Sequence, residues 1–438
     1  MTKTRMALVG AAVLAVATLT AVSGASAASA TRTESPIQHV VVIVQENHTF
    51  DNYFANYCKQ RVDPKTRKPV CDGRPSTYPG TTTGPVVLDD ATNASFDPNH
   101  AQSCELAEIN GGAMDGFLTA PPSQGKCGDP RNFAYAAAGA ASPVAYYQRL
   151  ATKGALADRY FQSVAGQSTS NDMYLWTTRF QFTDNTFEAQ AVGTQCSFAP
   201  ATKQYDDVTD PTNRNLGKTL SDAGVTWAWY GEGYAAMQTA GTGCPVAPSE
   251  CPIAPIQTSP CVYDPADMPS QFYASSVDQP AHMRDYAQLA TDLANNTLPS
   301  VVFVKPIGYK TEHPGLGQQL SPGVAFVRST IDAIQHSKAA KHTLVLLTYD
   351  EGGGYYDHVR TPPTSAVDNQ AYGPRIPAIA VGPFARAGAV SHTQLEHASI
   401  VKFVEWNWLA GKTGQLQGRD VTAHNLGSLL DPGLHVPA

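Results

Sequence analysis

Five stretches of the chain contain runs of consecutive apolar residues and predict β-strands. They lie within residues 37–45, 225–230, 300–306, 342–351 and 375–385. Unbroken apolar runs suit parallel strands covered on both faces, whereas a strand with one wet face alternates apolar and polar residues. The pattern therefore predicts a buried sheet in which most strands run parallel.

Helices are predicted between these strands, where apolar residues recur three and four positions apart. The expected helices cover residues 143–156, 282–294, 396–409 and a stretch that opens at Ser321 and Pro322. Strands and helices alternate through the second half of the chain, which is typical of an α/β fold with a mainly parallel sheet between helix layers. We expect residues 31–438 to form one domain with loop insertions.

The insertions are predicted where proline, glycine and cysteine accumulate, in residues 58–135 and in a loop or lid over residues 231–280. The eight cysteines all lie before residue 262: Cys58, Cys71, Cys104, Cys127, Cys196, Cys244, Cys251 and Cys261. An even number in an exported chain predicts disulfides, and the lack of a Cys-x-x-Cys pair argues against zinc. Pairing of sequence neighbours, such as Cys58 with Cys71 and Cys104 with Cys127, is the simplest arrangement.

Residues 1–30 have the pattern of a signal peptide. Lys3 and Arg5 precede an apolar run, and small residues that suit a cleavage site follow it. The alternative is a membrane anchor, but the run is short for a membrane span. We expect a secreted, extracellular monomer without a transmembrane anchor. The net charge of −7 and the absence of a basic block argue against nucleic acid as a partner.

Polar residues directly follow two of the predicted buried strands. Glu46 and Asn47 end one strand, and Asp350 and Glu351 end another. Ligands of α/β sheets bind beyond the carboxyl ends of the strands, where these oxygens can surround one divalent metal ion. The alternative is that each acid caps a turn or pairs with a basic residue. Clustered acids would repel one another, and a cation removes that cost, so we favour the metal site.

A hydroxyl and several imidazoles supply further chemistry. Ser168 follows Gly166 at the expected start of a helix, where backbone amides favour an anion such as phosphate. The alternative is that Ser168 only caps the helix. His100, His313 and His358 lie in loops beside acidic residues, glycine or proline, where they can bind phosphate or protonate a leaving group. These residues indicate a secreted, metal-dependent hydrolase with a hydroxyl nucleophile.

The stretch from Gln45 to Phe54 resembles the opening signature of the bacterial phosphoesterase family. That family includes non-specific phospholipases C and acid phosphatases, and has the α/β/α sandwich of the alkaline phosphatase superfamily. Further stretches resemble the family in the same order along the chain, at residues 111–117, 298–301, 312–314, 348–359 and 392–405. The resemblance extends over nearly all of residues 36–410.

The resemblance implies roles for individual residues. Four positions match the family's metal ligands: Glu46, Asn47, Asp350 and Glu351. Ser168 matches the nucleophile, and His100 and His313 match histidines near the phosphate. Asn171, His282 and His358, together with Asn47, are expected to contact the substrate. One divalent ion of unknown identity is the expected cofactor.

Three features depart from the family pattern. Ser170 replaces the usual proline before Asn171, His48 stands where arginine is common, and the chain stops soon after the core, without extra C-terminal β domains. The expected activity is hydrolysis of a phosphodiester of a phospholipid or a phosphocholine ester, as in phospholipase C. The alternatives are an acid phosphatase acting on small phosphomonoesters and a non-catalytic binding protein with the same fold.

Overall fold

The computed structural model describes most of the chain beyond its N-terminal segment. The described residues are 1–2, 32–73, 85–120, 125–196, 202–204, 213–252 and 260–438. Residues 32–438 form one compact unit. The predicted signal peptide lies, apart from its first two residues, outside the described residues.

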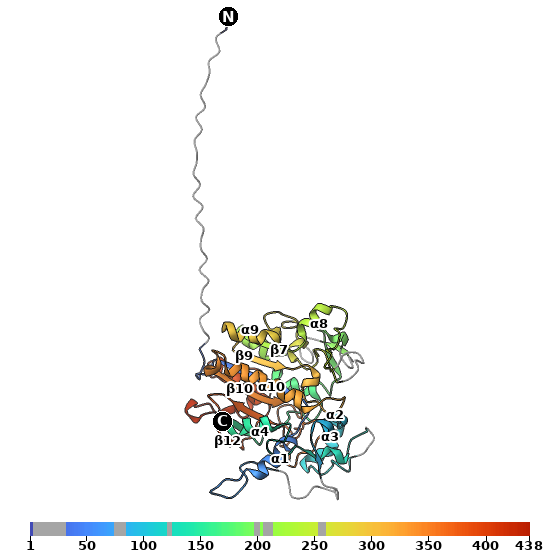
Figure 1. Ribbon diagram of the computed structural model, residues 1–438. Helices are drawn as coiled ribbons and strands as arrows, with labels where there is room; N and C mark the ends of the chain where they lie inside the picture. Colours follow the sequence, from blue (N-terminus) through green and yellow to red (C-terminus); the bar gives the residue numbers. More distant parts are fainter. Residues whose placement is uncertain (3–31, 74–84, 121–124, 197–201, 205–212, 253–259) are drawn as a thin grey trace. The chain divides into compact units, whose positions relative to one another are not determined.

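An eight-stranded sheet forms the centre of this unit (Figure 1). Its strands, in spatial order, are β12 (Ala389–Ser391), β4 (Ala155–Ala157), β11 (Ala378–Val381), β10 (Thr343–Tyr349), β1 (His39–Gln45), β9 (Val301–Lys305), β7 (Trp227–Gly231) and β8 (Met283–Asp285). β11 runs antiparallel to both of its neighbours, and the other pairs of this sheet are parallel. The predicted mainly parallel sheet is therefore confirmed.

The register of the central strands brings the polar strand ends together. β1 lies between β10 and β9, and Gln45 pairs with Tyr349. Glu46 and Asp350 are the residues that follow these two strands, so the two segments leave the sheet at the same level. β9 runs parallel on the other side of β1 and ends at Lys305.

Helices cover both faces of the sheet, as alternating side chains of β7 demonstrate. Trp229 points to the face where Trp176 of α6 (Tyr174–Thr177) packs. Tyr230 points the opposite way, where its hydroxyl donates to Asp292 of α9 (Ala287–Asn295). On the α9 side, α10 (Leu320–Gln335) packs beside α9 and α4 (Ala145–Lys153). On the α6 side, α6 packs beside α7 (Leu216–Asp222) and α11 (His397–Trp408). The helix layers predicted from the sequence are confirmed.

The cysteines form four disulfides, each between sequence neighbours. The pairs are Cys58–Cys71, Cys104–Cys127, Cys196–Cys244 and Cys251–Cys261. Cys58 belongs to α1 (Phe50–Gln60) and Cys104 to α3 (Gln102–Ile109), and Cys244 follows α8 (Tyr234–Ala240), so the bridges fasten the loops beside these helices. Disulfides, rather than zinc, account for the cysteine content.

One predicted helix begins too early. Residues 283–285, expected to be helical, form edge strand β8, and α9 begins at Ala287. Backbone pairing with β7 and stacking of His282 on Trp227 extend the sheet here, which periodicity alone did not reveal.

Among the described residues, no helix is long and apolar enough to cross a membrane.

Candidate active site

The ends of β1 and β10 are joined by a direct hydrogen bond between the two polar motifs. The backbone amide of Asn47 donates to Oδ1 of Asp350 at 3.1 Å. Asn47 has a φ of 63°, a left-handed conformation that asparagine tolerates better than most residues. A Cβ atom at Gly353 would lie 2.2 Å from the carbonyl oxygen of Asn47. Glycine is therefore needed where the turn after Glu351 crosses the turn after Glu46.

Two carboxylate oxygens of this cluster are buried without a partner. Oδ2 of Asp350 and Oε1 of Glu351 have no hydrogen-bond partner among the described residues, and both side chains are fully buried. Burial raises the pKa of Asp350, and burial together with the charge of Asp350 raises the pKa of Glu351 well above its usual value. Unpaired buried carboxylates are costly, and hard oxygen donors of this kind fit a divalent ion.

Glu46 differs from these two acids because each of its oxygens lies beside a polar group, although the contact of Oε1 with Lys305 is an ion pair without hydrogen-bond geometry. Oε1 lies 2.6 Å from Nζ of Lys305, and Oε2 accepts a hydrogen bond from the Thr311 hydroxyl at 3.1 Å. A carboxylate oxygen has two lone pairs, so Glu46 can still contribute to an ion. Glu46, Asn47, Asp350 and Glu351 thus offer the oxygen donors that a divalent metal ion prefers.

Ser168 lies at the start of α5 (Ser168–Asp172), and its hydroxyl donates to Oδ1 of Asn47 at 3.4 Å. The helix cap is Gln167, so Ser168 is the first helical residue and does not serve as the cap. The hydroxyl of Ser170 instead donates to the carbonyl oxygens of Phe182 and Asp184. The structure thus brings Ser168, rather than Ser170, to the acid cluster.

The loop before Ser168 is held by Asn171. The Asn171 amide donates to the carbonyl oxygens of Val164 and Gly166 and accepts from the amide of Val164. Because these bonds occupy its side chain, Asn171 positions the serine loop and does not line the cavity beside Ser168. This placement argues against the predicted substrate contact.

A cavity of about 310 Å³ opens beside Ser168. Its lining residues come from the strand ends and several loops: Glu46, Asp97, His100, Gln167, Ser168, Asn185, Pro260, Val262, Asp264, Asp267, Gly308, His313, Leu316 and Gln318. Four of them belong to the described part of the predicted lid, residues 231–280. The serine and the two candidate imidazoles therefore share one cavity.

His100 and His313 lie next to each other, with ring centroids 5.6 Å apart. Nε2 of His100 is 3.4 Å from Nδ2 of Asn47 and 3.9 Å from Oε1 of Glu351. Nδ1 of each ring faces a backbone carbonyl oxygen, at 3.0 Å for His100 and 2.8 Å for His313. A carbonyl can only accept, so Nδ1 carries a proton and Nε2 remains for other partners.

The two imidazoles differ in their affinity for a second proton. Burial lowers the pKa of His100. Burial also acts to lower the pKa of His313, but the negative charges of Asp97 and Glu46 outweigh it and raise that pKa overall.

Glu312, which precedes His313, is a fully buried carboxylate that sequence reasoning did not select. It accepts hydrogen bonds from the Gln45 amide and from three tyrosine hydroxyls, those of Tyr53, Tyr147 and Tyr349. Burial raises its pKa to about 7, although these donors oppose the shift. The bonds fix the loop that carries Thr311 and His313 to the end of β1.

Four further charged residues beside the cluster were also missed. Lys305 ends β9, Asp172 ends α5, and Asp264 and Asp267 line the cavity. Burial raises the pKa of both Asp264 and Asp267 to about 7. Lys305, like Glu46, is a charged residue directly after an apolar strand run. A search for charged residues at such positions would have identified it.

Two predicted substrate contacts, His282 and His358, are not among the residues that line this cavity. The ring of His282 stacks on Trp227 with centroids 3.8 Å apart, at the amino end of β7 and so at the opposite end of the sheet from Glu46. His358 has both ring nitrogens engaged, Nδ1 at 2.7 Å from Asp51 and Nε2 at 3.1 Å from Asp72. These contacts favour structural roles for both residues.

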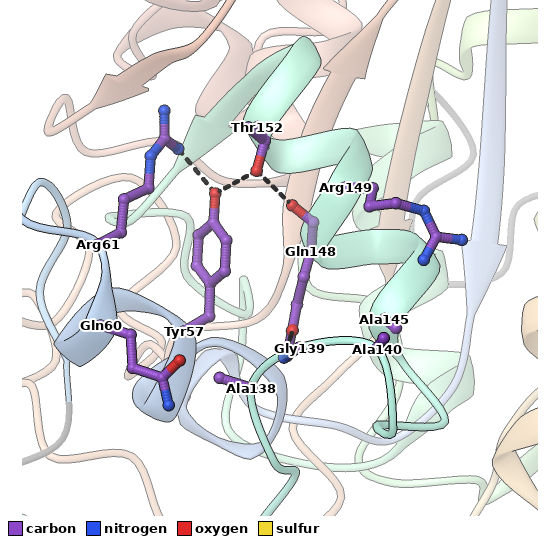
Figure 2. A pocket seen from close by; sticks show the side chains of 10 residues that line it. All are labelled: Tyr57, Gln60, Arg61, Ala138, Gly139, Ala140, Ala145, Gln148, Arg149 and Thr152. Atoms are coloured by element: carbon purple, nitrogen blue, oxygen red, sulfur yellow. Dashed lines mark hydrogen bonds between the residues drawn. The ribbon is translucent and has the colours of Figure 1, made fainter.

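A second cavity, of about 450 Å³, lies between the end of α1 and the start of α4 (Figure 2). Arg61 donates to the Tyr57 hydroxyl, which is 2.9 Å from the Thr152 hydroxyl. Of the described residues lining this cavity, none has a carboxylate, imidazole or thiol. It lacks the acid–base groups and nucleophile that the Ser168 cavity contains.

Comparisons with known proteins show the family of the chain. The sequence model of the Phosphoesterase family matches residues 37–409. Phospholipase C B of Mycobacterium tuberculosis is 26% identical over 434 residues, covering 90% of this chain and 77% of that protein. Hemolytic phospholipase C of Pseudomonas aeruginosa is 26% identical over 415 residues, covering 86% of this chain and 53% of that protein. Among solved structures, a protein in the alkaline phosphatase superfamily from Vibrio parahaemolyticus is 12% identical with a TM-score of 0.35, covering 84% of this chain and 77% of that one.

Proposed function

Because this chain belongs to the phosphoesterase family and is a phosphoric ester hydrolase, we propose that it cleaves its substrate through the hydroxyl of Ser168. One observation supports this above all. The Ser168 hydroxyl donates to Asn47, whose backbone amide bonds to Asp350, and Asp350 and Glu351 each have a buried oxygen without a hydrogen-bond partner among the described residues. That arrangement suits a nucleophile beside a cation site.

The chain's own groups can carry out both steps of the reaction. The Ser168 hydroxyl loses its proton to water as its oxygen forms a bond to phosphorus, and the bond from phosphorus to the leaving oxygen breaks. Nε2 of His313, whose pKa is raised so that the ring can carry a second proton, donates that proton to the leaving oxygen. Water then cleaves the phosphoserine and releases the phosphate or phosphomonoester. Glu46, Asn47, Asp350 and Glu351 would hold a divalent ion, which would supply positive charge that favours deprotonation of the serine and stabilises phosphoryl oxygens.

The proposed substrate is a phosphodiester such as a phospholipid or a phosphocholine ester. The relatives named above are phospholipases C, which supports this choice over a phosphomonoester. Secretion is part of the proposal, because four disulfides fit an oxidising compartment.

A substrate panel tests the proposal. Phosphatidylcholine, the p-nitrophenyl ester of phosphocholine and p-nitrophenyl phosphate are each incubated with the wild type, with and without a chelator. We expect metal-dependent release of phosphocholine from the lipid and of p-nitrophenol from the diester. Release of inorganic phosphate from the monoester alone would instead identify an acid phosphatase. Full activity in chelator would reject the metal.

A further inference from the structure

Leu316 is an exposed apolar residue at the edge of the cavity that contains Ser168. Its side chain is 46% exposed, and it lines this cavity together with Ser168 and His313. Single exposed apolar residues are ordinary on a protein surface. This one differs because it borders the site where the proposed reaction takes place.

The backbone of Leu316 has a conformation that does not suit leucine. Its φ is 49°, and it lies between Gly315 and Gly317, whose φ values are 79° and 77°. A bulky side chain in this left-handed region is strained, whereas asparagine or glycine tolerates the same backbone. A strained residue retained beside a candidate active site indicates that its side chain has a use there.

The turn that carries Leu316 is fastened to the rest of the molecule on both sides. The amides of its two neighbouring glycines donate to consecutive carbonyl oxygens of α2 (Asp90–Ser95), at 2.7 and 3.0 Å. The buried side chain of Asn93 donates to the carbonyl oxygens of Glu312 and Gln318, at 3.1 Å each. Leu316 is therefore presented by a fixed turn before any substrate binds.

The same loop carries the proposed general acid. His313 lies three residues before Leu316, and in the proposed reaction its Nε2 protonates the leaving oxygen. The leaving alcohol must then lie on the His313 side of the cavity. Pro260 and Val262 of the predicted lid add two further apolar residues to the cavity lining. The site thus offers apolar contacts for the carbon atoms of that alcohol.

We propose that Leu316 packs against the carbon chain of the leaving alcohol and gives the enzyme a preference for esters of long-chain, apolar alcohols. This inference rests on the proposed function and adds a specificity-determining residue to it. Contact with an apolar side chain removes area from water, so each methylene that Leu316 covers should raise kcat/KM about twofold to fourfold. Because the turn is already fixed, little ordering of the loop opposes this gain.

A series of butyl, hexyl and octyl esters of phosphocholine tests the inference. Release of phosphocholine is measured below the concentration at which each ester forms micelles, for the wild type and Leu316→Asn. From butyl to octyl, kcat/KM should rise about tenfold or more in the wild type and less than about threefold in the variant. The same rise in both proteins, or no rise in the wild type, would overturn the inference.

The choice of asparagine guards against a loss of folding. Asparagine tolerates the left-handed backbone, so Leu316→Asn should have a Tm at or above that of the wild type. Leu316→Met keeps an apolar side chain and should preserve most of the rise with chain length. Val421→Ser changes a valine that is 54% exposed and does not line the cavity, and should preserve all of it.

Vesicles of phosphatidylcholine distinguish contact with one substrate molecule from docking on a membrane surface. Binding to sedimented vesicles is compared for the wild type and Leu316→Asn. If the variant bound vesicles more weakly but kept the wild-type rise on the dissolved esters, Leu316 would serve surface docking and the inference would be overturned.

The outcomes also separate this inference from the proposed function. A wild type that cleaves the three esters at equal rates would overturn the role of Leu316 and leave the phosphodiesterase standing. A wild type that releases only inorganic phosphate from monoesters would overturn the proposed substrate class. Butyl, hexyl and octyl phosphate then replace the esters, and an equal dependence on chain length in the wild type and Leu316→Asn would overturn the role of Leu316 as well.

Discussion

Two buried clusters of this protein contain the same types of residue but differ in how their charges are met. In one, Asp51, Asp357 and His358 surround Arg375, whose guanidinium donates to Asp357 at 2.8 Å and to Asp51 at 2.9 Å. In the other, Asp350 and Glu351 lie beside His100 with oxygens that lack partners among the described residues. The charges of the first cluster are met by its own residues, whereas the second keeps buried oxygens that are free to bind a cation.

The comparison gives a criterion for separating structural from functional acids. Both clusters include an aspartate and a histidine, so residue type did not separate them. Hydrogen-bond accounting does, because the acids around Arg375 have all their oxygens engaged, whereas Asp350 and Glu351 each keep a buried oxygen without a hydrogen-bond partner among the described residues. We therefore expect His358 to serve the fold and propose that Asp350 and Glu351 serve the reaction.

The largest expected effect is on catalysis. Ser168→Ala should lower kcat/KM on the p-nitrophenyl ester of phosphocholine by on the order of a thousandfold or more, because the proposed nucleophile is lost. Ser170→Ala is the matched control, since its hydroxyl bonds to the loop carbonyls of Phe182 and Asp184. It should retain activity within a few-fold. Turnover of Ser168→Ala near that of the wild type would reject the role of Ser168.

The next largest effect is on stability in the compensated cluster. Arg375→Met leaves Asp51 and Asp357 buried without their cation, and should lower the free energy of unfolding by about 3–5 kcal/mol. Urea denaturation at equilibrium measures this. Arg328→Met removes an exposed pair with Asp332 and should change stability by less than about 1 kcal/mol. Equal effects of the two substitutions would contradict the comparison.

His358 makes the stability of the same cluster depend on pH. Burial acts to lower its pKa, but its bonds to Asp51 and Asp72 raise that pKa to about 10. A pKa raised on folding stabilises the protein fully below the unfolded value of about 6.5, and this contribution disappears as the pH rises through about 10.

His358→Gln should therefore cost about 2 kcal/mol near pH 6 and progressively less toward pH 10. Denaturation curves across this range measure the difference from the wild type. His336→Gln, at an exposed helix end, is the control and should produce no such trend. A cost that grew with pH would show that the pair does not stabilise the fold in this way.

The smallest expected effect has the opposite sign. In chelator, Glu351→Gln should raise the free energy of unfolding by about 1 kcal/mol, because it removes a buried charge whose pKa is raised by burial and by Asp350. The same substitution should reduce the thermal stabilisation that added metal gives the wild type. Glu34→Gln on the surface is the control. A loss of stability in chelator would mean that Glu351 is compensated without an ion.

The sequence predicted the parts of the molecule that depend on local pattern. Apolar runs located β1, β9 and β10. The polar residues that follow β1 and β10 are Glu46, Asn47, Asp350 and Glu351, and the register brings them together at the carboxyl ends of these strands. The family resemblance is confirmed by the match over residues 37–409. These inferences succeed because strand ends and motifs are encoded over a few consecutive residues.

Other features depend on partners far away in the chain. Nothing near Glu312 predicts that Tyr53, Tyr147 and Tyr349 donate to it, or that Arg375 meets Asp51. His358 was predicted to contact the substrate because its two acidic partners, 307 and 286 positions away, are not evident from the residues around it. Side-chain pairing over such separations requires the assembled fold.

The disulfides imply an order of events as the chain is made. Each bridge joins neighbours, at separations of 13, 23, 48 and 10 residues, and the last cysteine is Cys261. β1 cannot pair with β9 or β10 until those strands are synthesised, after every cysteine has emerged. Oxidation can therefore close the N-terminal loops before the sheet assembles, and the long-range pairing then begins from a chain with fewer conformations to search.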